Sequence, residues 1–299
     1  MSKRNLLLCF DAFGTLFTPK RPIAQQYGEV ARALGLSGFT DEQVHASFKD
    51  AFKREAKESP NFGKANGSNA ARWWTNIIHN TFSPLIEPTT KLPEDLAPRL
   101  IYRFSSEEAY ELRPGVLALL QDLRTHPPRG VDRIAVGVIT NSDDRVPNVL
   151  TCLGLRVSPL TFDKGASMTT PPRGEQYDVD FTVMSYDVGC EKPDAQIFKA
   201  AEDLLGTLPV AEGAEASSWE KVHVGDEYDK DVVGARNAGW SSVLLEEQAA
   251  SQSDRSDVDE LASGDLLRKL RASRCDASFS SFGALARALG VDGSGRHGS

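Results

Sequence analysis

The chain has 299 residues, of which 40% are hydrophobic, so it can form one large domain or a core with an inserted subdomain. Its formal net charge of -8 at pH 7 supplies no basic surface for nucleic acid or an anionic membrane. The apolar run from Leu6 to Phe10 is too short for a signal peptide, and no apolar segment is long enough to span a bilayer. These features exclude a nucleic-acid-binding or membrane-spanning protein from our expectations.

The cysteines show neither CxxC nor zinc-ligand spacing, and two of them lie in apolar runs. We expect reduced thiols at Cys9, Cys152, Cys190 and Cys275. Together with the composition, this predicts a soluble intracellular protein, cytoplasmic or nuclear.

The first predicted element is a buried strand, "NLLLCF", which ends at Asp11 in a tight turn. Helical patterns follow, and no strand pattern appears between residues 18 and 113. One helix is bracketed by Pro22 and Gly35, and another opens with a capping box formed by Thr40 and Gln43. Two more segments, "ARWWTNIIHNTF" and "EDLAPRLIYRF", also read as helices, the second interrupted by Pro98. Residues 18–112 are therefore predicted to form an all-helical insertion.

Strands and helices alternate after residue 113. A helix in "RPGVLALLQDLR" precedes the strand "IAVGVIT", and a helix in "DAQIFKAAEDLLG" ends at Gly206. The strand "KVHVG", a helix through "KDVVGARNAG", the strand "SSVLL" and a helix in "FGALARAL" complete the series. Such alternation with short connections predicts an α/β fold, a Rossmann-like parallel sheet in which the N-terminal strand is central.

The predicted division of the chain follows from these patterns. Residues 1–17 and 113–291 form the core, and residues 18–112 form the helical insertion. The polar stretches 158–178 and 246–265 are predicted surface insertions, and 292–299 a disordered tail.

Polar residues follow several of the predicted strands. Asp11 follows the first strand, Thr140 and Asn141 follow "AVGVI", and Asp226 follows "VHVG". Because ligands bind beyond the carboxyl ends of parallel strands, these side chains are candidates for one site. Lys192 in "EKPD", just ahead of a helix, is a further candidate.

This set of motifs resembles the haloacid dehalogenase (HAD) superfamily. "FDAFGTL" is similar to its first motif, "GVITNS" to its second, and the Lys-Pro pair in "EKPD" to its third. Gly225, Asp226 and Asp231 match the fourth motif, GDxxxxD. The resemblance covers the chain except the two polar stretches and the tail. Within the superfamily, the stretch "PNFGKANGSNAARWW" is similar to the eukaryotic haloacid dehalogenase-like hydrolase domain-containing group. It implies that the helical insertion is a cap domain.

The resemblance also implies roles for individual residues. Asp11 would be the nucleophile, forming a covalent aspartyl intermediate, with Thr140 and Lys192 as the other catalytic residues. Mg²⁺ would be held by Asp11, Asp226 and the backbone carbonyl of Phe13. A small phosphorylated metabolite would be the substrate; Asn141, Gly14 and Thr15 would contact it, and Asp231 would support the metal from the second shell. The resemblance implies no oligomeric state.

Phe13 departs from the pattern of the family's phosphatases. They carry at this position a second Asp, which protonates the leaving group. Phe cannot donate a proton, and general acid–base catalysis typically raises the reaction rate by about 10²–10⁴-fold. An aromatic residue at this position resembles the 2-haloacid dehalogenases, which displace halide without a metal. Those enzymes bind the substrate carboxylate with an arginine of the cap, and Arg32 is one candidate for that role here. That branch lacks the acidic pair that Asp226 and Asp231 provide.

Three hypotheses follow. The first is a Mg²⁺-dependent hydrolase, the second a metal-independent dehalogenase, and the third a catalytically inactive binding or regulatory protein that keeps the fold. Trp73 and Trp74 are adjacent and cannot share one helix face, so one is expected in the core of the insertion and the other at a site mouth.

Overall fold

The computed structural model describes residues 4–162, 175–246, 265–273 and 276–291. They form two compact units. The core unit contains residues up to 18, residues 112–141 and the described residues from 154 onward; the helical unit contains residues 19–111 and 142–153. Residues 142–153, which the sequence division assigns to the core, thus group with the helical unit.

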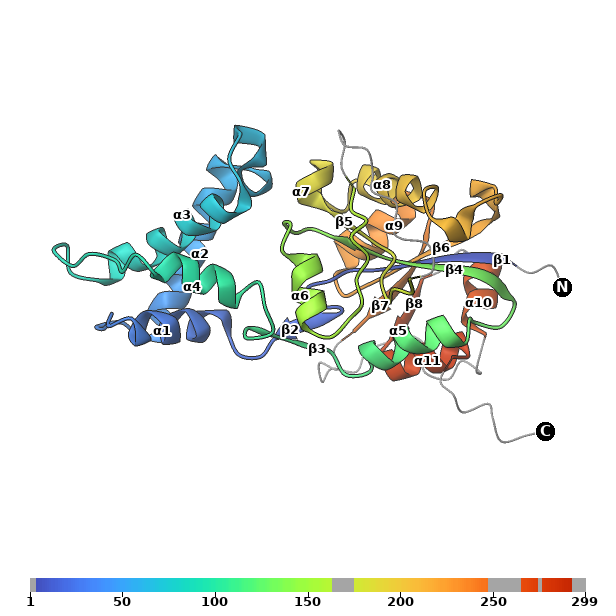
Figure 1. Cartoon of the computed structure of the whole chain (residues 1–299), viewed down its shortest axis with the longest axis horizontal. Helices are drawn as coiled ribbons and strands as arrows, with labels where there is room; N and C mark the ends of the chain where they lie inside the picture. Colours follow the sequence, from blue (N-terminus) through green and yellow to red (C-terminus); the bar gives the residue numbers. More distant parts are fainter. Residues whose placement is uncertain (1–3, 163–174, 247–264, 274–275, 292–299) are drawn as a thin grey trace. The chain divides into compact units, whose positions relative to one another are not determined.

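A parallel sheet forms the centre of the core unit (Figure 1). Its strand order is β5-β4-β1-β6-β7-β8, and each neighbouring pair is parallel. The bounds are β1 (Arg4–Phe10), β4 (Val131–Thr140), β5 (Phe181–Met184), β6 (Trp219–Gly225), β7 (Ser241–Leu245) and β8 (Ala277–Phe279). The predicted parallel sheet is confirmed, and β1 lies inside it between β4 and β6.

Helices cover both faces of this sheet. Helix α8 (Ala195–Leu205) lies over one face, and α5 (Val116–Thr125) and α11 (Phe282–Leu289) lie over the other (Figure 1). The core unit also contains the helices α7 (Ser185–Val188), α9 (Gly234–Asn237) and α10 (Leu266–Ser273), with single 3-10 turns at Pro209–Ala211 and Ala216–Ser218. Two-sided cover explains why the central strands are almost wholly apolar.

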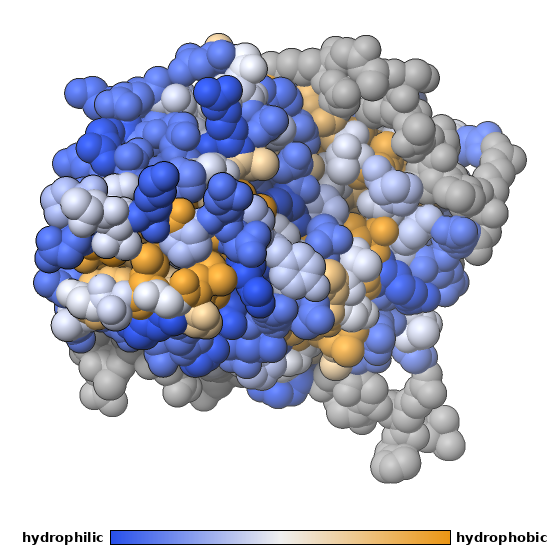
Figure 2. Space-filling view, turned by 60° about the vertical axis from the view of Figure 1, so that its left-hand side comes forward, coloured by the Kyte–Doolittle hydropathy of each residue, from blue (hydrophilic) through white to orange (hydrophobic). Residues whose placement is uncertain are grey.

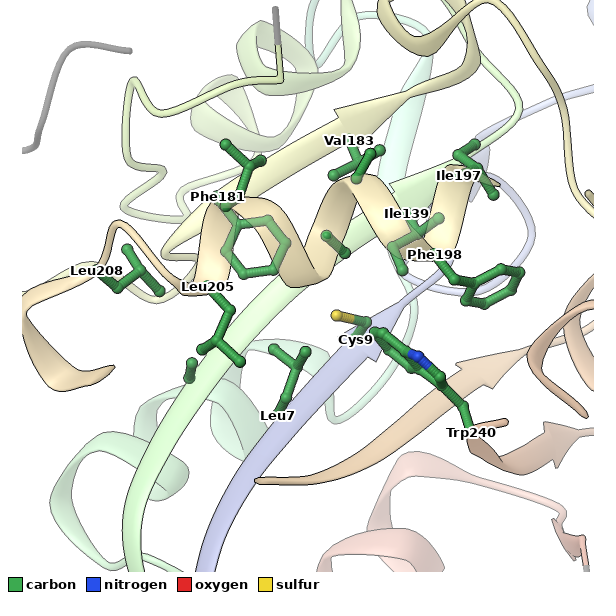
Figure 3. Close-up of a cluster of buried hydrophobic side chains, with 14 of the residues drawn as sticks. Leu7, Cys9, Ile139, Phe181, Val183, Ile197, Phe198, Leu205, Leu208 and Trp240 are labelled. Atoms are coloured by element: carbon green, nitrogen blue, oxygen red, sulfur yellow. The ribbon is translucent and has the colours of Figure 1, made fainter. Parts of the chain in front are cut away.

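Alternate residues of β1 supply the two halves of the apolar core. Leu7 and Cys9 pack into a cluster with Phe198 of α8, which Figure 3 shows beneath that helix. Phe10 points to the other face, where its ring centroid lies 6.2 Å from that of Phe282 in α11. This period-two alternation fixes the register of β1 against both helical layers.

Two of the predicted helices can be compared with the structure in detail. Helix α8 ends at Leu205 with Gly206 as its C-cap, as predicted, although this glycine has φ −60°, a right-handed conformation open to any residue. The helix predicted through "KDVVGARNAG" is a π-helix over Tyr228–Val233 followed by the short α9. Asp231 lies within this π-helix, and π-helical turns are frequent at functional sites.

The helical unit contains α1 (Ile23–Ala33), α2 (Asp41–Glu58), α3 (Ala70–Phe82), α4 (Leu96–Arg103) and α6 (Val146–Cys152). Two 3-10 helices, Asn61–Asn66 and Ser83–Leu85, connect them. The capping box of Thr40 and Gln43 is confirmed at the start of α2. Pro98 does not interrupt α4 but lies in its first turn, where a backbone N–H has no helical partner to lose.

Two short strands correct the prediction that residues 18–113 contain no strand. Strand β2 (Phe17–Pro19) pairs with β3 (Tyr110–Leu112) in a separate two-stranded sheet. Three-residue strands are too short to display the alternation by which strands are recognised. This pairing joins the two ends of the helical insertion.

The predicted insertions fall largely outside the described residues, as do Cys275 and the tail. Within the described ends of the stretch 158–178, the prediction of a surface insertion is wrong for Ser158, Leu160 and Asp178, which are buried, whereas Pro159 is exposed. Within the described ranges, Cys9, Cys152 and Cys190 take part in no disulfide. Hydrophilic side chains dominate the face in Figure 2, with hydrophobic ones gathered in smaller areas. Across the described ranges, no helix combines the length and apolar character needed to cross a bilayer.

Candidate active site

The turn after β1 places Asp11 at the carboxyl-terminal edge of the sheet, directly beyond the last residue of this central strand. Its backbone N–H donates to the carbonyl of Val224 in β6 over 2.8 Å, which continues the sheet by one residue. The chain then reverses as the N–H of Leu16 donates to Ala12 and that of Gly14 to Phe17. Gly14 has φ +88°, which a residue with a side chain rarely adopts. The Asp11 side chain retains only 11% of its exposure, so its carboxylate is largely shielded from water.

Lys192 connects Asp11 to Asp231. Its Nζ donates to Asp11 Oδ1 over 2.6 Å, to Asp231 Oδ1 over 2.7 Å and to the carbonyl of Ile139 over 2.9 Å. Three acceptors satisfy all three ammonium protons. Burial favours the neutral amine, but the two carboxylates outweigh it and raise the pKa of Lys192. The lysine is therefore a fixed positive charge beside Asp11.

The two carboxylates respond differently to the same burial. Burial raises the pKa of Asp11, and the Lys192 ammonium only partly offsets the rise. Burial also acts on Asp231, but Lys192 and His223 outweigh it and hold its pKa well below the usual range. His223 Nε2 lies 3.0 Å from Asp231 Oδ1, and the N–H of Glu227 donates to Asp231 Oδ2 over 2.9 Å. Asp231 is thus a firmly held anion.

Asp226 lies against the turn that follows the nucleophile candidate. The Thr15 hydroxyl donates to its Oδ1 over 2.6 Å. A Cβ built on Gly14 would lie 2.4 Å from Asp226 Oδ2, which is closer than atoms can pack. Glycine at 14 is therefore required both by the left-handed turn and by the approach of this carboxylate. Burial raises the pKa of Asp226, and the Thr15 hydrogen bond opposes the rise.

Asp11 and Asp226 come together at neighbouring strand ends, as predicted, and Asp231 of the π-helix joins them. One carboxylate oxygen from each of Asp11, Asp226 and Asp231 lies within 4.8 Å of the other two. Hard oxygen donors at such spacing suit Mg²⁺ better than a soft transition metal. The donor set fits the metal, although Asp231 Oδ1 and Asp11 Oδ1 already accept from Lys192.

Thr140 is the last residue of β4, and Asn141 directly follows it and contacts Lys192. Thr140 is buried at the end of the strand. The Asn141 side chain makes two hydrogen bonds to Lys192: its Nδ2 donates to the lysine carbonyl over 2.9 Å, and its Oδ1 accepts from the lysine N–H over 2.7 Å. Asn141 and Thr15 are thus bonded to the protein, and their direct contacts with a substrate stay predictions.

Phe13 presents an exposed ring next to these acids in the sequence. The ring is 42% exposed and packs edge to face on Phe17 with 5.5 Å between centroids. Role assignments for the Phe13 carbonyl as a metal ligand and for Thr140 as a substrate contact remain predictions.

Two further residues of the site were not assigned a role from the sequence. His223 alternates with Val222 and Val224 in β6, so its pattern is that of a core residue, yet it contacts Asp231. Arg113 Nη1 donates to the carbonyl of Gly14 over 2.7 Å and so supports the turn from outside it. The contact joins residues 99 positions apart, and no local pattern could have indicated it.

Comparison with known proteins agrees with this arrangement. Residues 6–239 match the family described as haloacid dehalogenase-like hydrolase. The chain belongs to that family. An uncharacterised hydrolase of Schizosaccharomyces pombe is 32% identical over 79% of this chain and 88% of its own length. Haloacid dehalogenase-like hydrolase domain-containing protein 3 of mouse is 29% identical over 80% of this chain and 81% of its own length.

A solved structure of this haloacid dehalogenase-like family shares the fold. The HAD-hydrolase YfnB of Bacillus subtilis, bound to magnesium, superposes with a TM-score of 0.53 at 14% identity over 96% of this chain and 99% of that one. This likeness extends over both the α/β core and the helical segments of the chain. The match of residues 6–239 to the family confirms the membership predicted from the four motifs, and this structure shows the same fold.

Proposed function

We propose that the protein is a Mg²⁺-dependent hydrolase of small phosphorylated molecules, with Asp11 as the nucleophile. The observation that carries the proposal is the convergence of Asp11, Asp226 and Asp231 within 4.8 Å, with the Lys192 ammonium 2.6 Å from Asp11. Family membership supports a hydrolase, and the acidic set at the strand ends supports the choice of metal.

Asp11 and Asp226 would hold the metal with the carbonyl of Phe13, and Asp231 would orient this shell through Lys192. Bound Mg²⁺ would neutralise negative charge on the phosphoryl group and on the nucleophile. Lys192 limits the repulsion between Asp11 and an incoming dianion, because its charge is fixed 2.6 Å from the attacking carboxylate. Thr140 would donate to a phosphoryl oxygen.

The reaction has two steps. The Asp11 carboxylate attacks phosphorus, forming an O–P bond while the bond to the leaving oxygen breaks with its electron pair. Water then attacks the aspartyl phosphate, Asp11 leaves as the carboxylate, and a proton from that water ends on the released leaving group. Covalent catalysis of this kind replaces one difficult displacement by two easier ones.

Phe13 narrows the range of efficient substrates. Without an acid at this position, the leaving oxygen departs unprotonated, and general acid help is typically worth about 10²–10⁴-fold. Substrates with stable leaving groups, such as acyl or aryl phosphates, are therefore favoured over alkyl phosphates.

A panel of acyl, aryl and alkyl phosphates with Mg²⁺ tests the proposal. Wild-type protein should hydrolyse the acyl and aryl members, and Asp11→Asn should abolish turnover. Asp203→Asn is the matched control, because that aspartate is half-exposed on α8 and pairs only with Lys199 among the described ion pairs. Turnover that survives Asp11→Asn would end the proposal. A covalent adduct trapped on Asp11, with fluoroberyllate or a labelled acyl phosphate, would exclude the non-catalytic alternative.

Phe13 favours one second candidate, a metal-independent dehalogenase, because a halide leaves without a proton. Asp226 argues against it, since a carboxylate held beside Asp11 would repel the substrate's own carboxylate. Halide release from 2-chloropropionate in the presence of EDTA would favour this candidate over the first.

A further inference from the structure

Arg113 holds the turn after β1 at two points. Its backbone N–H donates to the carbonyl of Leu16 over 2.9 Å, and its Nη1 donates to the carbonyl of Gly14 over 2.7 Å. All three residues belong to the core unit, so both contacts lie within one compact unit. One residue that is distant in the sequence thus binds both the middle and the end of the turn that follows Asp11.

Gly14 is the point at which this turn needs an external restraint. Its φ of +88° and the close approach of a neighbouring carboxylate require glycine there. Glycine also has the widest backbone freedom of any residue, so no side chain of its own restrains the peptide plane that joins Gly14 to Thr15. The hydrogen bonds described within the turn end on the carbonyls of Ala12 and Phe17, not on that of Gly14. Arg113 therefore supplies a restraint that the turn itself does not provide.

The Gly14 peptide leads directly to a proposed metal ligand. Its carbonyl and the Thr15 N–H lie in one planar peptide unit, so fixing the carbonyl orients the start of Thr15. Thr15 is fully buried, and its hydroxyl donates to Asp226 Oδ1 over 2.6 Å. The contacts therefore run from the Arg113 guanidinium through one peptide and one hydroxyl to Asp226.

The charge of Arg113 does not explain its place beside this site. A guanidinium stays protonated, and a cation close to a Mg²⁺ site repels the metal ion. Its donors are, however, held in a rigid planar fork, and its charge strengthens a hydrogen bond to a carbonyl. The geometry that Arg113 imposes on the turn is therefore the better explanation of its contact with Gly14.

We propose that Arg113 is a positioning residue of the site. By holding the Gly14–Thr15 peptide, it keeps Thr15 bonded to Asp226 and so sets the affinity for Mg²⁺. The effect on affinity rests on the proposed function and its metal site, whereas the restraint on the turn can be tested without a metal. Arg113 itself contacts neither metal nor substrate in this role.

Arg133 provides a matched control. It lies near the amino-terminal end of β4, at the end of the sheet opposite the site, and its Nη1 donates to the carbonyls of Val210 and Glu212 over 3.1 and 2.8 Å. Arg113→Met and Arg133→Met each remove a guanidinium that binds backbone carbonyls in the core unit, and they change the net charge equally. Arg113→Lys keeps the positive charge but loses the planar fork.

Calorimetric titration with Mg²⁺ is the first measurement. Arg113→Met should weaken Mg²⁺ binding about 10-fold, the scale of losing the support of a ligand, and Arg113→Lys should fall between it and the wild type. Arg133→Met should bind Mg²⁺ as the wild type does. Loss of positive charge alone would tighten the binding, so unchanged or tighter binding by Arg113→Met would overturn the inference.

Hydrogen exchange supplies a readout that needs neither metal nor turnover. The amides of residues 12–17 should exchange faster in metal-free Arg113→Met than in the wild type and in Arg133→Met. Unchanged exchange there would overturn the inference. A wild type that binds no Mg²⁺ would overturn both the proposed metal site and the role of Arg113 in affinity. Mg²⁺ binding with equal affinities in Arg113→Met and Arg133→Met would leave the proposed function standing and refute the positioning role.

Discussion

A phenyl ring stands two residues after the proposed nucleophile, and its exposure of 42% leaves room for another side chain. Phe13→Asp should therefore fold and should place a carboxylic acid where a leaving oxygen can take its proton. We expect alkyl phosphate hydrolysis to rise at least 10-fold, within the roughly 10²–10⁴-fold range of general acid catalysis. Aryl phosphates, which need no proton, should gain less. Steady-state rates on matched alkyl and aryl substrates measure the difference.

Phe13→Asn is the control for this change. It has the shape and polarity of Asp but cannot supply a proton at neutral pH. If Asn raises alkyl turnover as much as Asp does, the gain comes from removing the ring and position 13 is not the missing acid.

Gly14 offers a second residue-scale prediction, on metal affinity. A methyl group there meets Asp226 Oδ2 at 2.4 Å, so Gly14→Ala should displace a proposed ligand and weaken Mg²⁺ binding by about 10–100-fold, the usual effect of disturbing a ligand's support. Gly35→Ala has the same φ of +88° but open space around its Cβ. Both should cost about 1 kcal/mol or slightly more in stability for the left-handed backbone. Calorimetric titration with Mg²⁺ should show weaker binding by Gly14→Ala than by Gly35→Ala. Equal Mg²⁺ affinities of the two variants would contradict the role of Asp226 as a ligand.

At the scale of elements, one buried carboxylate joins two segments beside the sheet. Asp178 is 1% exposed, and its oxygens accept from the N–H, Nε and Nη2 of Arg156 over 2.8, 3.2 and 2.6 Å. Between them, Val157 and Val179 form a parallel bridge. Burial alone would raise the pKa of Asp178, but the Arg156 hydrogen bonds outweigh it and lower the pKa from that of an ordinary aspartate.

The lowered pKa fixes the sign of a pH effect. A depressed acid stabilises the fold above its unfolded-state pKa, and the contribution is lost as pH falls through the lower folded-state value. Asp178→Asn should therefore cost roughly 1–3 kcal/mol of unfolding free energy at pH 7, typical for hydrogen bonds to a charged group. The gap from wild type should shrink below about pH 4, where the unfolded carboxyl is protonated. Denaturant unfolding at pH 7 and below about pH 4 measures the difference in unfolding free energy between wild type and Asp178→Asn, with Asp203→Asn as the exposed control. A difference that does not change with pH would show that the charge of Asp178 is not involved.

Elements with a strong local pattern could be predicted, and elements without one could not. The apolar runs of β1, β4 and β7 and the helical spacing in α5, α8 and α11 are recognisable from residues that are neighbours in the chain. Strands β2, β3 and β8 have three residues each, too few for a period to show. Their pairing depends on partners far away in the sequence, which tertiary packing selects.

The same distinction applies to the site as a whole. Asp11 and Asp226 could be predicted to meet because parallel strands deliver their carboxyl ends to one edge, and Lys192 could be added from the resemblance of its motif. The partners of those groups could not: Thr15 lies 211 positions from Asp226, and His223 looks like any core residue of β6. The division of the molecule shows the same limit, since residues 142–153 are attached to the helical unit by the Trp74 side chain of α3 and by the backbone carbonyl of Ser105, both far away in the sequence.

Two units with separate cores should lose structure separately. Ile77 is buried in α3 within the helical unit, and Leu204 is buried in α8 within the core unit. Ile77→Ala and Leu204→Ala each remove the same kind of buried apolar volume, at a cost of about 2–5 kcal/mol. Local opening should then spread through the unit that carries the cavity.

Native-state hydrogen exchange can follow this spread. In Ile77→Ala, residues 23–82 should lose protection together with residues 142–153, while β4 and α5 keep it. Leu204→Ala should give the reverse pattern, with β4 and β5 exchanging faster and α3 unchanged. If residues 142–153 instead keep wild-type protection in Ile77→Ala and lose it in Leu204→Ala, they belong energetically to the core, as the sequence division has them.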